Sequence, residues 1–222
     1  MASKLMRVIV GRHGAADLIL QHSPNALLPN LPTLNENLTI VDFAHTAFGV
    51  DCPTPLHFDD EHVPAQDVTL IWCGNVDTYM SNIKTAEIMS IPLTSNARLL
   101  GNQSTPEIYI RNLAVVPSYD NLSDMIESIK DGFYLVGGDG SEGSPEGEYA
   151  CLIRSGYHIY NGKLAEKISS CAVWGFGADF LQTISMIADD FCWYPDEYNE
   201  WYNINASVGA PSVKVCMNTG NL

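Results

Sequence analysis

The apolar positions of this chain fall in short runs that polar, proline and glycine residues separate. Short runs rich in β-branched residues are typical of strands. Within 107–116, Ile108 and Ile110 alternate with polar neighbours, which is the period of two that a half-buried strand shows. The strands expected from these runs cover residues 5–10, 38–43, 68–73, 107–116 and 212–216.

One segment, residues 122–130, carries a clear helical period. Its apolar positions follow the i, i+3, i+4, i+7 spacing of one helical face: Leu122, Met125, Ile126 and Ile129. Asn121 is a good N-cap residue, and Gly132 follows as a stop. Shorter helices are expected at 15–22, which Pro24 ends, from Asp77 or Thr78 to near Pro92, and at 178–188.

A hairpin is expected over residues 157–168, because Asn161-Gly162 supplies the positive φ values that a type I′ turn needs. Strands outnumber helices in this pattern, and the two do not alternate as they do in a parallel α/β protein. We therefore expect an α+β fold in which residues 1–222 form a single domain. Its antiparallel-rich sheet should be curved or barrel-like, with a few helices.

Composition narrows the class of protein. The chain has 222 residues with 26 acidic and 11 basic side chains, and the net charge of −15 disfavours nucleic acid as a partner. No apolar stretch is long enough to span a membrane, and no apolar run behind Arg7 suggests a signal peptide. The six cysteines lie at least 20 residues apart without a C-x-x-C pair. A soluble, cytoplasmic protein with reduced thiols is expected.

Residues 138–143 match the glycine pattern G-x-G-x-x-G after a strand predicted at 133–136. A dinucleotide site also needs a helix that begins at this loop, so that its N-terminus can meet the phosphates. Ser144-Pro145-Glu146 follows instead, with acidic residues around the loop. We expect a flexible connection between strands and no cofactor site in this chain.

The histidines are the obvious metal candidates, but none occurs in H-x-x-x-H or H-E-x-x-H. His57 and His62 flank the acidic run 59–61, where carboxylates could hold a hard cation, although a solvated acidic turn is the favoured interpretation. No serine has the G-x-S-x-G context of a nucleophile, and the cysteines are expected to pack in apolar surroundings. We therefore assign no catalytic, cofactor-binding or metal-binding residue.

Residues 191–202 have the most unusual composition in the chain, because six aromatic residues are interspersed with three acidic ones there. Clustered aromatic residues with a polar rim suit a buried interface with a partner. Rings that fold over the protein's own core are the alternative, and both interpretations stay open.

Taken in order, several segments resemble the C-terminal half of the TldD/PmbA family. An acidic turn is followed by a strand and a glycine, then by a small-residue stretch, a helix–strand pair and three further segments. The matching residues are Asp59-Asp60-Glu61, 68–74, Thr94-Ser95-Asn96-Ala97-Arg98, 126–134, Gly156 to Leu164, 184–190 and 208–215. Each segment is weak alone, but the order and spacing of all of them are specific.

The resemblance implies a zinc peptidase motif, H-E-x-x-x-H on a helix, and a cysteine near the C-terminus. The corresponding helix here is Ala15 to Leu27, which holds His22 but no glutamate that could act as a general base. The cysteine position falls near Glu197, with Cys192 displaced. This pattern is similar to the TldE branch, whose members pair with a TldD-type subunit. The family's N-terminal domain is not expected in this chain.

Three functions remain open. The first is a non-catalytic, TldE-like subunit of a metallopeptidase that processes or degrades peptides. Its partner would be a TldD-like subunit that carries zinc, or the chain would form a homo-oligomer. In that role an extended peptide would add to a sheet edge. The second is an independent peptide-binding or scaffold protein. The third is a stand-alone hydrolase with an unusual metal site built from His13, His22, His57 or His62.

Overall fold

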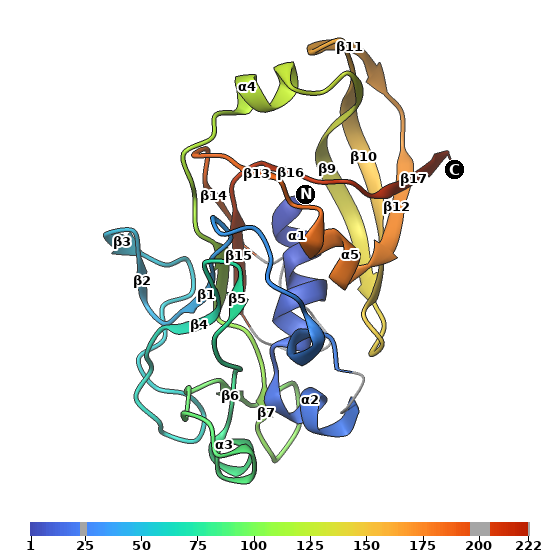
Figure 1. The fold of residues 1–222 in the computed structure, drawn as a ribbon. Coiled ribbons are helices and arrows are strands. Elements are labelled where there is room, and N and C mark those ends of the chain that lie inside the picture. Colours follow the sequence, from blue (N-terminus) through green and yellow to red (C-terminus); the bar gives the residue numbers. More distant parts are fainter. Residues whose placement is uncertain (23–25, 196–204, 222) are drawn as a thin grey trace.

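A central helical segment lies between two β-sheets, as Figure 1 shows. The computed structural model describes residues 1–22, 26–195 and 205–221. In Figure 1 the N-terminal helix, in blue, has one sheet on its left and the long strands of the other on its right. The small helix α4 (Leu122–Glu127) lies at one end of the molecule, near the start of the long strands.

The described residues contain short helices and many short strands. The helices are α1 (Ala2–Met6), the π-helix η1 (Arg7–Gly11), α2 (Ala16–His22), the 3₁₀ turn η2 (Leu28–Asn30), α3 (Ile83–Met89), α4 (Leu122–Glu127) and α5 (Gly177–Gln182). The strands are β1 (Ile40–Phe43), β2 (Thr46–Ala47), β3 (Val50–Asp51), β4 (Val68–Trp72), β5 (Asn75–Val76), β6 (Ala97–Arg98), β7 (Glu107–Ile108), β8 (Asn112–Val115), β9 (Asp131–Gly143), β10 (Glu148–Tyr160), β11 (Lys163–Ile168), β12 (Cys171–Phe176), β13 (Met186–Ile187), β14 (Cys192–Pro195), β15 (Ser207–Ala210), β16 (Val213–Lys214) and β17 (Asn218–Asn221).

Two larger sheets organise these strands. The first has the order β14-β15-β8-β1-β4-β5, and β15 with β8 is its parallel pair. In the second sheet β10 pairs with β9 on one side and with β11 and β12 on the other, and β17 follows β12. Both sheets are open in the described part of the chain, where they form no closed barrel. The α+β, antiparallel-rich class is confirmed.

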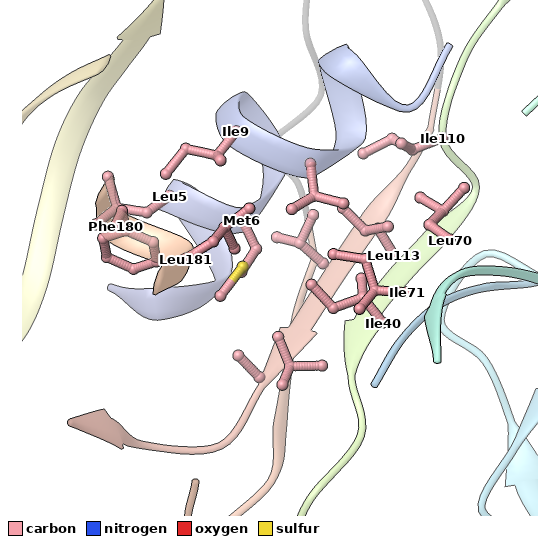
Figure 2. Packing of buried hydrophobic residues seen from close by; sticks show 14 of the residues in the cluster. Leu5, Met6, Ile9, Ile40, Leu70, Ile71, Ile110, Leu113, Phe180 and Leu181 are labelled. Carbon is pink, nitrogen blue, oxygen red and sulfur yellow. The ribbon is translucent and has the colours of Figure 1, made fainter. Parts of the chain in front are cut away.

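The strand expected at residues 5–10 is wrong, because α1 and η1 occupy this region. Leu5, Met6, Ile9 and Val10 are at most 1% exposed, since the helix is covered from both sides. Figure 2 shows Leu5 and Met6 beside Phe180 and Leu181 of α5, with the first-sheet residues Ile40, Ile71 and Leu113 farther to the right. A short, wholly apolar run fits a strand or a buried helix equally well by its periodicity. One core cluster joins this helix to both sheets, as a single domain requires.

The elements with local signals are confirmed. Asn121 caps α4 with its side-chain oxygen, which accepts the backbone N–H of Asp124 at 2.9 Å. The hairpin β10–β11 turns at Asn161 and Gly162, whose φ angles are 48° and 74°. The strands expected at 38–43 and 68–73 are β1 and β4.

Tertiary contacts shorten other expected elements. The helix expected from Asp77 or Thr78 begins only at Ile83, because Met80 is extended and exchanges backbone hydrogen bonds with Gly14 and Ala16. The strand expected over 107–116 is split into β7 and β8, and the helix expected to reach residue 188 ends at Gln182. Pro24, expected to end α2, lies outside the described residues.

The flexible connection expected at the glycine pattern is also wrong, because residues 138–143 continue β9 beside β10. A side chain at Gly138 would meet the Cys151 sulfur at 3.0 Å, and one at Gly137 would meet the Ser155 hydroxyl at 2.9 Å. Glycine here permits close approach of two strands. None of the described helices has the length and apolar character needed to cross a membrane.

Candidate functional site

The predicted histidine ligands lie in different surroundings. His13 sits between η1 and α2 and is 2% exposed. Burial lowers its pKa to about 4, and the charge of Arg12 acts in the same direction, so its imidazole is neutral at physiological pH. His22 is the last residue of α2 and is half-buried. Within α2, Ala16–His22, it is the one residue with a metal-ligating imidazole.

His57 and His62 are exposed and border the acidic run, but the solvated turn expected there is only partly correct. Asp59 is 3% exposed, and its carboxylate accepts the backbone N–H groups of Glu61, Val63 and Ala97 at 2.8–3.2 Å. This acid therefore holds the turn together, with its oxygens already occupied by donors. In the described ranges no three histidine, cysteine, aspartate or glutamate side chains gather as a metal site would need.

The structure gathers four aromatic rings into what we call the aromatic corner: Phe43, Phe48, Phe191 and Trp193. The rings come from β1, the β2–β3 hairpin and the beginning of β14. Their centroids are 4.9–6.5 Å apart and their planes lie at 68–89°, which is the edge-to-face arrangement that aromatic pairs prefer. The sequence had indicated Phe191 and Trp193 as interface candidates.

Phe48 holds a costly position in this corner. Its φ angle is 53°, a left-handed conformation that phenylalanine rarely adopts, and Gly49 follows with φ 83°. Such a conformation costs on the order of 1–2 kcal/mol per residue. The ring nevertheless remains 48% exposed, and Val50 beside it is 60% exposed. Backbone strain that presents an apolar ring to solvent favours a role in contact rather than in the core.

The strand beneath the corner, β14, is the outermost strand of the first sheet in the described part of the chain. Gly209 of β15 lies under the rings, where a side chain would come within 2.4 Å of Phe191 and 2.8 Å of Trp193. Residues 196–204, which include the rest of the aromatic-acidic segment and Glu197, lie outside the described residues. Sequence reasoning missed Phe43 and Phe48, which are distant along the chain; the Phe48-Gly49 pair at a turn was the one available signal.

Two thiols of the described residues, Cys52 and Cys171, are held in the protonated form. Burial raises the pKa of Cys52 to about 11, and the charges of Asp67 and Asp42 act in the same direction. Burial also raises the pKa of Cys171. Both groups are therefore poor nucleophiles at neutral pH, in agreement with packing as their role. The corner is thus suited to contact, and it holds no group that its surroundings activate for chemistry.

The comparisons with known proteins agree on one family. The family described as PmbA/TldA metallopeptidase C-terminal domain matches residues 1–220. Two similar proteins are a zinc metalloprotease TldD homolog of Saccharolobus solfataricus, 28% identical over 163 residues, and a metalloprotease TldD homolog of Buchnera aphidicola, 30% identical over 166 residues. Each alignment covers 72% of this chain but only 36% and 34% of the relative, so the chain spans about a third of the length that they have.

Solved structures show the same fold. TldE from Thermococcus kodakarensis superposes with a TM-score of 0.73 at 19% identity, over 96% of this chain and 47% of that one. A protein of Thermotoga maritima described as a putative modulator of a DNA gyrase gives a TM-score of 0.71 at 21% identity, over 98% of this chain and 47% of that one. At these identities the likeness establishes the fold alone.

Proposed function

The chain belongs to the PmbA/TldA metallopeptidase family, whose C-terminal domain matches residues 1–220. On this premise we propose that it is a non-catalytic, TldE-like subunit. Its partner would be a TldD-type subunit that carries zinc, and the assembly would process or degrade peptides. The observation that carries the proposal is the aromatic corner, a strained and half-exposed cluster suited to contact with another protein. We place this work in the cytoplasm, where the six free thiols would stay reduced.

The residues of this chain do not fit catalytic zinc. Zinc peptidases hold the ion with two imidazoles one helical turn apart and use a nearby glutamate as general base. No histidine of the sequence is followed by glutamate, and α2 offers His22 alone. His13 is nine residues away and enclosed. We therefore propose that this chain performs no chemical step and that the partner activates the attacking water.

The corner fits a partner by its chemistry as well as by its shape. Aromatic residues at the centre of a patch dominate many protein interfaces. Because each copy carries a charge of −15, a second copy would meet electrostatic repulsion, which favours a different chain as the partner.

The test is co-expression with a TldD-type chain that contains H-E-x-x-x-H. We expect a stable hetero-oligomer by size-exclusion chromatography with light scattering, and zinc only when the partner is present. Phe48→Asn removes the ring and keeps a residue that tolerates positive φ. It should weaken the complex at least about tenfold, which corresponds to about 1.4 kcal/mol.

The matched control is Trp174→Ala, which removes an exposed aromatic side chain from β12 in the other sheet and should change affinity less than about twofold. Thermal unfolding of each variant verifies that it folds. Stoichiometric zinc on the isolated chain would instead favour the stand-alone hydrolase with an unusual histidine site. Failure to bind any TldD-type chain would favour the independent peptide-binding protein.

A further inference from the structure

A cavity of about 460 Å³ lies at the end of the molecule where α4 is found. It is bounded by the start of β9, by the apolar side of α4 and by the segment 210–217. Tyr194 lines it from β14, whereas Trp193, its neighbour, belongs to the aromatic corner. Successive side chains of a strand point to opposite faces, so β14 separates the cavity from the corner. The volume lies within the range of about 300–1,000 Å³ that ligand sites commonly have.

The wall formed by β9 is unusual, because all six consecutive residues from Asp131 to Val136 line the cavity. Alternation along a strand allows only every second side chain to face one side. Six residues in succession therefore border the cavity with the backbone edge of β9. The opposite edge of β9 pairs with β10, and in the described part of the chain no strand pairs with the cavity edge.

Farther along the same edge, groups from the central helical segment cover the backbone carbonyls. The N-terminal amine donates to the Val136 oxygen at 3.4 Å, Lys4 Nζ donates to the Gly138 oxygen at 2.7 Å, and Arg12 donates to the Gly143 oxygen. Protein side chains commonly protect an edge strand in this way. The stretch from Asp131 to Leu135 precedes these contacts. At about 3.3 Å per residue it offers an edge of about 13 Å.

The other walls are apolar and partly open. Half-buried side chains line the cavity from α4, from the turn that follows it and from the C-terminal segment: Ile126, Ile129, Val213, Val215 and Met217. Asp131 and Asp190 also line the cavity, as do two cations that have partners: Lys214 donates to the Ser128 hydroxyl at 2.7 Å, and the N-terminal amine donates to the Val136 oxygen at 3.4 Å. The two acids and the two cations of the lining balance one another, but the whole chain carries a charge of −15. An apolar ligand that carries positive charge is therefore complementary to the negative field of the whole chain.

We propose that this cavity binds an extended peptide segment, which adds as a strand to the free edge of β9 at Asp131 to Leu135. The segment carries apolar side chains toward α4 and Val215 and at least one lysine or arginine near Asp190. Backbone hydrogen bonds supply affinity in this mode, and the side-chain environment supplies selectivity. No residue of α2, where the family's zinc motif would lie, lines the cavity. The proposal concerns this chain alone and does not depend on a TldD-type partner.

The test measures fluorescence anisotropy of a labelled, blocked pentapeptide, Val-Lys-Leu-Lys-Val, with the purified full chain. Three changes should each weaken binding at least about tenfold. They are N-methylation of alternate peptide amides, replacement of both peptide lysines by glutamate, and the cavity-filling variant Val215→Trp. The matched control Ile88→Trp places the same ring on the exposed side of α3, where the isoleucine is 57% exposed, and should leave binding within about twofold.

Hydrogen exchange then locates the peptide independently of any variant. Bound peptide should protect backbone amides within 131–135, while the amides of the outer strand β11 should exchange as before. No binding at about 1 mM peptide would overturn the proposal. Equal affinity for the N-methylated peptide, or protection confined to another region, would overturn it as well. None of these results bears on the complex with a TldD-type chain, so the two proposals fail separately.

Discussion

Two clusters of charged groups in this molecule use similar chemistry in opposite surroundings. In the interior, Arg111 Nε lies 2.9 Å from Asp42 Oδ2, and both side chains are 0% exposed. On the outer face of the second sheet, His158 lies 2.7 Å from Asp131 and 3.1 Å from Glu166, whose side chains are 72% and 74% exposed. Protein groups occupy the donors of Arg111 and the carboxylate oxygens of Asp42, whereas water competes for every partner of the outer cluster. Breaking the interior cluster should therefore lower the free energy of unfolding by a large amount, whereas breaking the outer cluster should change it only slightly.

The interior cluster joins β1 to β8. Asp42 Oδ1 accepts the backbone N–H groups of Arg111 and Asn112 at 2.9 and 3.0 Å, and Asn96 donates to Asp42 Oδ2 at 2.7 Å. The guanidinium also donates to the backbone oxygens of Asp42 and Gln66 at 3.0 and 2.9 Å. A buried charge is tolerated when its hydrogen bonds are this complete. Removing one partner would leave the other charge without compensation.

The largest effect should come from breaking this interior pair. Arg111→Met keeps an apolar stem of similar length but leaves the Asp42 carboxylate buried and unpaired. We expect a loss of about 3–5 kcal/mol in the free energy of unfolding, measured with urea at neutral pH. Lys163→Met, at an exposed position of β11, is the control and should change stability by less than about 0.5 kcal/mol. A loss below about 1 kcal/mol for Arg111→Met would remove the distinction between the clusters.

A second prediction concerns Asp59, a buried acid without a basic side chain on its oxygens. Its carboxylate accepts three backbone N–H groups, so Asp59→Asn would place an amide NH₂ against donors. The free energy of unfolding should fall by about 1–3 kcal/mol. Asp51→Asn makes the same chemical change at an exposed position and should have little effect. Equal stabilities of the two variants would show that the turn does not depend on the ionised acid.

These contrasts also explain what the sequence could predict. Asn161-Gly162 and the cap at Asn121 act within a few residues, so the hairpin and α4 followed from local rules. The helix at α1 could not be separated from a strand, because burial from both sides makes all of its positions apolar. The glycines of β9 are typical of a loop, and only the neighbouring β10 gives them another purpose.

For the same reason, only half of the aromatic corner could be predicted from the sequence. Phe191 and Trp193 stand in a conspicuous segment, whereas Phe43 and Phe48 join them only through the pairing of β15 with β8 and of β8 with β1. The backbone edge at Asp131 to Leu135 has no signal in the sequence at all. An unpaired edge is a property of the sheet and depends on which other strands are absent from its side.

A third prediction compares two histidines. Burial lowers the pKa of His13 to about 4, below the value of 6.5 in an unfolded chain. Between these values the unfolded chain binds a proton that the folded chain does not, so stability should fall as the pH is lowered from about 6.5 toward 4. His13→Gln should flatten this part of the stability curve, measured by urea unfolding at several pH values. His62→Gln, at an exposed position, should leave the slope unchanged.

The smallest effect should come from His158, with the opposite sign. The hydrogen bond to Asp131 raises its pKa, and the bond and charge of Glu166 act in the same direction. Its contribution to stability is therefore fully present below pH 6.5 and is lost as the pH rises through the raised folded value. His158→Gln should lower the melting temperature slightly at about pH 5.5 and not at about pH 9. Salt should erase even this difference, because exposed charges are screened over about 10 Å at 0.1 M. If the difference survived about 1 M salt, the outer cluster would behave like the interior one, and burial would not be what distinguishes them.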